Sequence, residues 1–149
     1  MSIITDIATL ESLANDKKWK GDYVGAYQVR TQLEEIYAQK SQICKGRVQN
    51  LNQLVGLAVR IQESGEALRF ARTSAELSSD LTEATKANST MLYAAVLAEN
   101  RLFNDAVIEA KNAIAIFESL LGVENEFVCY RKRDLVRMQN GDTGPYLDL

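Results

Sequence analysis

Few side chains in this sequence have the type and spacing that catalysis requires. The chain contains no histidine, which excludes a Ser-His-Asp triad, a Cys-His protease and any zinc site that needs imidazole. Its two cysteines, Cys44 and Cys129, form no C-x-x-C pair and are expected to be buried. The carboxylates of Glu11, Glu34 and Glu35 have no partner at helical spacing that repeats a ligand geometry, and no phosphate loop, calcium loop or nucleophile elbow is present. We therefore expect no catalytic residue, no metal and no cofactor, and hence no enzyme.

Length and charge indicate one soluble domain. The 149 residues are 46% hydrophobic, and 17 basic against 20 acidic residues give a net charge of −3. This balance argues against a nucleic-acid partner, since Asp134 also interrupts the basic run of Arg131, Lys132 and Arg133. The start of the chain lacks the basic region of a signal peptide, and no uncharged stretch approaches the roughly 20 residues that cross a bilayer. We expect a cytoplasmic protein with no membrane partner.

The elements that would have to position any site are helices. The only proline is Pro145, helix-forming residues dominate, and the alternation typical of strands is missing. Glycines stand where one apolar period stops and the next begins, which favours left-handed helix ends at Gly21, Gly46, Gly65, Gly122 and Gly141. An all-α fold with about seven antiparallel helices follows, with these expected ranges: 3–18, 22–44, 47–63, 66–82, 87–99, 103–121 and 124–139.

The first six helices repeat one plan. Each of three helix pairs has a short polar turn followed by a second helix that opens with an alanine, namely Ala26, Ala67 and Ala106, at spacings of 41 and 39 residues. Two helices joined by a tight turn approach closely near that turn only if small side chains lie at the contact. Twelve residues upstream, each first helix supplies one small or medium-sized residue: Ala14, Val55 and Ala94.

These shared positions resemble the tetratricopeptide repeat (TPR) family. The third pair fits best, at Tyr93-Ala94 and Phe103-Asn104-Asp105-Ala106, and its period near forty is similar to the longer repeats of kinesin light chains. The resemblance implies three helix-hairpin repeats stacked into one domain over residues 1–140. The helix at 124–139 would cap this stack, and residues 141–149 would form an irregular C-terminal tail.

In TPR proteins the first helix of each repeat faces a groove that holds an extended or helical peptide. One asparagine in each unit suits a peptide backbone, because a side-chain amide both donates and accepts hydrogen bonds. The same asparagines are equally consistent with ordinary solvated helix positions. Carried over residue by residue, the resemblance implies a partner-binding groove formed by Glu11, Asn15, Lys18, Gln49, Asn52, Arg60, Asn88, Met91 and Ala95.

The resulting hypothesis is a non-catalytic protein–protein interaction module: a scaffold, adaptor or assembly chaperone that binds a protein or peptide. The alternative is a structural helical-bundle subunit that forms a homo-oligomer within a larger assembly. Trp19 either packs in the core beneath the first turn or stands exposed as an anchor for a partner. The tail residues Tyr146, Leu147 and Leu149 either dock, on another subunit or in the groove itself, or stay mobile.

Overall fold

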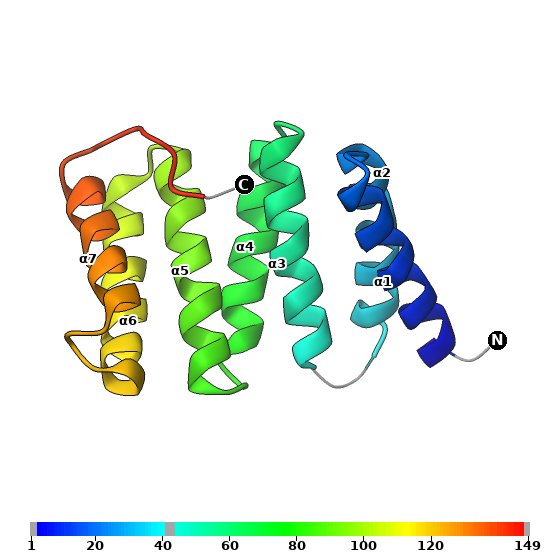
Figure 1. The fold of residues 1–149 in the computed structure, drawn as a ribbon, viewed down its shortest axis with the longest axis horizontal. Helices are drawn as coiled ribbons and strands as arrows, with labels where there is room; N and C mark the ends of the chain where they lie inside the picture. The colour runs from blue at the N-terminus through cyan, green and yellow to red at the C-terminus, as the bar shows by residue number, and fades with distance from the viewer. Residues whose placement is uncertain (1–2, 41–43, 148–149) are drawn as a thin grey trace. The chain divides into compact units, whose positions relative to one another are not determined.

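The computed structural model describes residues 3–40 and 44–147. Over these ranges it contains seven helices and no strand, which confirms the predicted all-α fold (Figure 1). The helices are α1 (Ile3–Trp19), α2 (Tyr23–Ala38), α3 (Lys45–Arg60), α4 (Ser64–Ser78), α5 (Glu83–Glu99), α6 (Phe103–Leu121) and α7 (Glu126–Gln139). No helix in the described part of the chain is long and apolar enough to cross a membrane.

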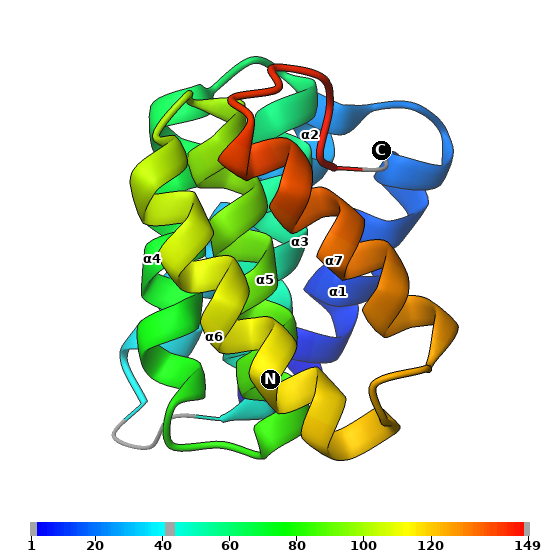
Figure 2. The ribbon, with the colours of Figure 1, turned by 90° about the vertical axis from the view of Figure 1, so that its left-hand side faces the viewer.

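The chain divides into two compact units, residues 1–70 and 71–149, with the boundary inside α4. In the first unit α1 packs against α2, and α2 packs against α3. In the second unit α6 packs against α5 on one side and α7 on the other, as the two views of the ribbon show (Figures 1 and 2). The single domain expected over residues 1–140 stays a prediction.

The three hairpin turns share one backbone geometry. One residue in each turn has a positive φ, and the next residue donates its N–H to the carbonyl five positions earlier, at 2.8, 2.7 and 2.9 Å. This six-to-one bond is the Schellman motif, which satisfies carbonyls at the end of a helix. The positive-φ residues are Gly21 (83°), Gln62 (65°) and Arg101 (61°), and each lies five positions before one of the marker alanines.

Small residues lie at the helix contacts beside these turns, as the repeat predicts. Ala26, Ala67 and Ala106 are fully buried. Their upstream counterparts, Ala14, Val55 and Ala94, are at most 1% exposed. In each hairpin the marker alanine also donates its backbone N–H to the carbonyl four residues earlier, at 2.9 to 3.0 Å, so it belongs to the first turn of the second helix.

Two of the predicted glycine caps are wrong. Gly21, Gly122 and Gly141 have positive φ, but Gly46 and Gly65 lie within the first turns of α3 and α4. The turn before α4 instead takes its left-handed residue from Gln62. α2 ends at Ala38 and α3 begins at Lys45, and residues 41–43 between them lie outside the described ranges.

Some helix ends also differ from their predicted positions. α2 ends at Ala38 rather than at residue 44, and α5 begins at Glu83 rather than at residue 87. The earlier start of α5 has a local cause, since the Thr82 hydroxyl accepts the backbone N–H of Thr85 at 3.3 Å and caps the helix.

Candidate functional site

A polar hollow of about 430 Å³ lies over α1, α2 and α3 in the first unit. Four of the predicted groove residues line it, two from α1 and two from α3. A buried arginine of α2 and two further amides of α3 complete the lining. The full set is Glu11, Asn15, Arg30, Gln49, Asn50, Asn52 and Gln53.

Arg30 forms the floor of this hollow. It is 7% exposed, and its guanidinium donates to Asn50 Oδ1 at 3.1 Å and to Asn15 Oδ1 at 2.8 Å. Asn50, itself 1% exposed, returns a hydrogen bond from Nδ2 to the Arg30 carbonyl at 3.0 Å. Burial lowers the pKa of Arg30, and the nearby Glu11 carboxylate opposes that shift. This network holds α1, α2 and α3 in register beneath the hollow.

Tyr37 fixes the carboxylate of Glu11 at the edge of the hollow. Its hydroxyl donates to Glu11 Oε1 at 3.1 Å. Burial, the hydrogen bond and the negative charge of Glu11 together raise the pKa of Tyr37 to about 12. Gly46 leaves room for the phenol, because a Cβ at that position would lie 2.8 Å from the tyrosine oxygen. Glu11 is therefore oriented by a neutral donor.

The rim of the hollow offers both donors and acceptors. Lys18 Nζ donates to Gln53 Oε1 at 3.2 Å, which leaves the Gln53 NH₂ group to donate. The Asn15 oxygen accepts from Arg30, so its NH₂ group is likewise directed to donation. Both amides are exposed, and so is Gln49. An extended peptide presents one N–H and one C=O per residue, and this surface can pair with both.

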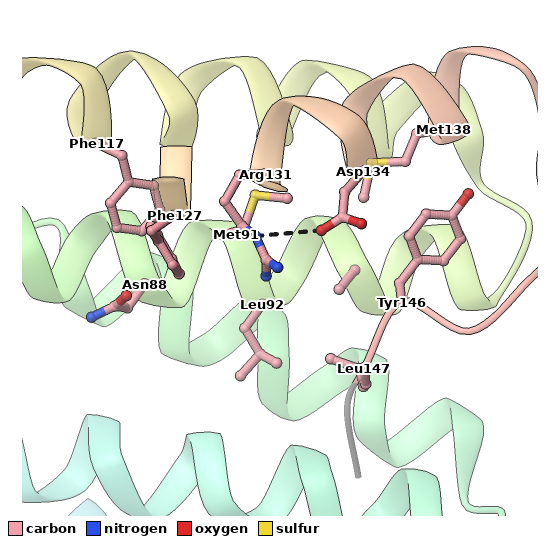
Figure 3. A pocket seen from close by; sticks show the side chains of 11 residues that line it. Asn88, Met91, Leu92, Phe117, Phe127, Arg131, Asp134, Met138, Tyr146 and Leu147 are labelled. Carbon is pink, nitrogen blue, oxygen red and sulfur yellow. Dashed lines mark ion pairs between the residues drawn. The ribbon is translucent and has the colours of Figure 1, made fainter. Parts of the chain in front are cut away.

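The remaining predicted groove residues lie elsewhere. Arg60 is outside the hollow and stacks over the ring of Tyr23, 4.4 Å from its centroid. In the second unit Asn88, Met91 and Ala95 line a separate pocket of about 250 Å³ between α5 and α7 (Figure 3). The structure thus brings four of the predicted residues together in the first unit and three in the second.

Trp19 is 92% exposed, so the core alternative for this residue is wrong. The two cysteines are half-buried free thiols rather than core residues. Within the described ranges no group of three or more acidic or thiol side chains is placed to hold a metal ion.

Sequence reasoning missed Arg30 and Asn50, which organise the hollow from below. A signal for Arg30 was present, because it falls within the apolar stripe of α2 that includes Val29 and Leu33. A charged residue in a buried stripe requires partners in the fold, and Asn50 is a polar residue in the equivalent situation on α3.

Comparison with solved structures assigns the architecture. The chain superposes with a TM-score of 0.81 on a crystal structure of nearly identical TPR-like repeats from a candidate kinesin light chain of Podosopora anserina. The match covers 95% of this chain and 69% of that one, at 16% sequence identity. No protein-family model and no curated protein sequence matches the chain. This is a TPR-like helical repeat fold.

The repeat geometry agrees with that comparison at the level of single turns. Three successive hairpins carry the same positive-φ residue, the same six-to-one hydrogen bond and the same buried alanine. The resemblance inferred from the marker alanines is therefore confirmed for the fold.

Proposed function

We propose that this chain is a non-catalytic protein-interaction module, a scaffold, adaptor or assembly chaperone of the cytoplasm, that binds an extended peptide of a partner protein. The observation that carries the proposal is the amide-rich hollow of the first unit, in which Glu11, Asn15, Gln49 and Asn52 converge above the buried Arg30. The TPR-like fold supports it as a general class of binding scaffold.

Recognition in this hollow would rest on the peptide backbone. Asn15 and Gln53 offer N–H donors, and the carboxylate of Glu11 offers an acceptor held by Tyr37. The Arg30 network fixes the position of Asn15 before the peptide arrives, so less rotamer freedom is lost on binding. Backbone recognition of this kind gives moderate affinity with limited dependence on partner sequence.

The test is peptide selection on the full chain, followed by point variants. Peptides selected from a display library of random short sequences would be measured by fluorescence anisotropy. We expect the double variant Asn15→Leu/Asn52→Leu to bind the selected peptides about tenfold or more weakly than the wild type. Each lost hydrogen bond is worth about 0.5–1.5 kcal/mol. The matched control, Gln28→Leu/Gln32→Leu on the exposed side of α2, should bind like the wild type.

Two results would argue against the proposal. Equal affinity of the hollow variant and the wild type, with unchanged melting, would place the peptide elsewhere. If no selected peptide binds the Asn15→Leu/Asn52→Leu variant more weakly than the wild type, the hollow is not the binding site.

The alternative, a structural subunit that associates with copies of itself, is favoured by one observation. Trp19 is 92% exposed at the end of α1, and Val24 nearby is 54% exposed. Large exposed apolar side chains of this kind are enriched at interfaces. Sedimentation of the full chain separates the two hypotheses: an oligomer should dissociate when Trp19→Ser is introduced, whereas an adaptor should sediment as one chain with or without that change.

A further inference from the structure

The C-terminal segment 141–147 returns from the end of α7 to α5 (Figures 1 and 2). We call residues 141–147 the strap. Gly141 has a φ of 68°, and the next residue donates its N–H to the Arg137 carbonyl at 2.9 Å, which reverses the chain after α7. The backbone N–H groups of Tyr146 and Leu147 both donate to Glu99 Oε1 on α5, at 2.7 and 3.3 Å. One carboxylate oxygen thus accepts two successive backbone N–H groups of the strap.

Arg137 holds the other edge of the strap. Its Nη2 donates to the Pro145 carbonyl at 3.1 Å and its Nε to Asp142 Oδ2 at 2.9 Å, while the guanidinium lies 4.4 Å from the centroid of the Tyr146 ring. The Gly144 N–H and Arg137 both lower the pKa of Asp142, so this carboxylate stays charged. Tyr146 is 8% exposed, and its hydroxyl donates to the Asp142 carbonyl. The Tyr146 side chain is therefore buried and held by its contacts with Arg137 and Asp142.

The pocket beside the strap is mainly apolar. It holds about 250 Å³ between α5 and α7, and Tyr146 and Leu147 form part of its wall (Figure 3). Phe117 and Phe127 meet edge to face at the far end, with centroids 4.9 Å apart. The apolar lining continues through Met91, Leu92, Ala95 and Met138, and the charged lining is the Arg131–Asp134 ion pair.

We propose that the surface between α5 and α7 on which the strap packs is a binding site for a peptide in which an aromatic residue is followed by an aliphatic one, and that the strap is its resident occupant. The strap engages the site through two backbone N–H groups, one backbone carbonyl, an aromatic ring and a leucine. A partner segment of the same chemistry presents the same groups. Glu99 and Arg137 supply the backbone contacts, and the apolar lining takes the side chains.

A tethered occupant competes strongly with a free one. The strap follows α7 directly, so its effective concentration at the pocket is on the order of 1 mM. A free peptide with an intrinsic Kd of about 100 μM would then bind the native chain about tenfold more weakly than a chain whose strap has been released. The inference rests on the proposed function only in taking this chain to be a peptide-binding module, and it concerns a second site, in the pocket that Asn88 and Met91 line.

The experiment uses the full chain and a fluorescent synthetic peptide, Gly-Asp-Thr-Gly-Pro-Tyr-Leu, whose sequence is that of residues 141–147. The double variant Tyr146→Ala/Leu147→Ala releases the strap. We expect the peptide to bind this variant at least about tenfold more tightly than the wild type. A peptide with alanine in place of its tyrosine should not bind. Tyr130→Ala, which removes an exposed aromatic of α7, should behave like the wild type.

Equal binding to wild type and double variant, or no binding to a variant whose circular dichroism and melting show it folded, would overturn the inference. If the double variant unfolds, Tyr146→Ala alone makes the same test, because it removes the ring that seats the strap and leaves Leu147 in place. Asn15→Leu/Asn52→Leu separates the two proposals: it should lower the affinity of library peptides for the hollow and leave binding of the strap peptide unchanged.

Discussion

Replacing Arg101 with glycine should stabilise the protein. Arg101 is exposed and holds a φ of 61° in the turn between α5 and α6. The left-handed conformation costs a residue with a Cβ about 1–2 kcal/mol, and glycine avoids this cost. Glycine also gains about 0.4–1 kcal/mol of unfolded-chain entropy, which opposes the benefit. The net gain in the free energy of unfolding should be about 0.5–1 kcal/mol, or about 1–4 °C in Tm.

At the equivalent position of the first hairpin, we expect a substitution to lower the free energy of unfolding. Gly21 has a φ of 83°, and no atom lies within 4 Å of a Cβ built there, so Gly21→Ala introduces backbone strain without a clash. We expect a loss of about 1 kcal/mol. Lys111→Gly, at an exposed position inside α6, is the matched control and should also lose about 1 kcal/mol. Urea denaturation of the full chain measures the free energy of unfolding of all three variants. If Arg101→Gly lowers it as much as Lys111→Gly does, the turn geometry is refuted.

Three further predictions concern the core and the hollow. Ala106→Leu should overpack the α5–α6 crossing and lower the free energy of unfolding by about 1–3 kcal/mol, whereas Ala115→Leu on the exposed side of α6 should change it little in the same urea titration. Asn50→Leu should cost about 2–4 kcal/mol, because it removes two hydrogen bonds to the buried Arg30, and calorimetry of the full chain would detect it. Tyr37 binds its proton more tightly when folded, so the free energy of unfolding should be retained below pH 10 and fall between about pH 10 and 12, with phenolate absorbance reporting the late titration.

The helices were predictable wherever the chain marks both of their ends. α6 spans the predicted 103–121, because its apolar stripe ends at Gly122, which has the positive φ of a helix cap. α2 was predicted six residues too long, since no glycine or proline follows Ala38 to mark its end. Periodicity identifies helices reliably, but their ends depend on local capping.

Four of the seven residues that line the hollow were predictable from helix geometry. Glu11 and Asn15 are four residues apart on α1, and Gln49 and Asn52 are three apart on α3, so each pair must share a helix face. Arg30 belongs to a different helix, and its position beneath those faces depends on how α2 packs between α1 and α3. Periodicity within one helix carries no information about that packing.

Trp19 shows the limit of hydrophobicity as a guide to burial. It is the one tryptophan of the chain, yet it is 92% exposed where α1 ends between Lys18 and Lys20. The apolar stripe of a helix determines which positions face the core, and Trp19, five residues after the buried Ala14, points about 140° away from that side of α1 at 3.6 residues per turn. Ala14, a much smaller residue on the same helix, is buried to 1%.

The repeat is conserved in backbone geometry more closely than in residue type. All three hairpin turns adopt the left-handed conformation, but only the first uses glycine. Gln62 and Arg101 each cost about 1–2 kcal/mol there, which a folded domain with roughly 5–15 kcal/mol of stability tolerates when buried alanines and the six-to-one hydrogen bond maintain the turn. Sequence identity of 16% and a TM-score of 0.81 are compatible for this reason. The fold constrains a torsion angle and a small side chain at each crossing, and these constraints leave most residue types free to vary.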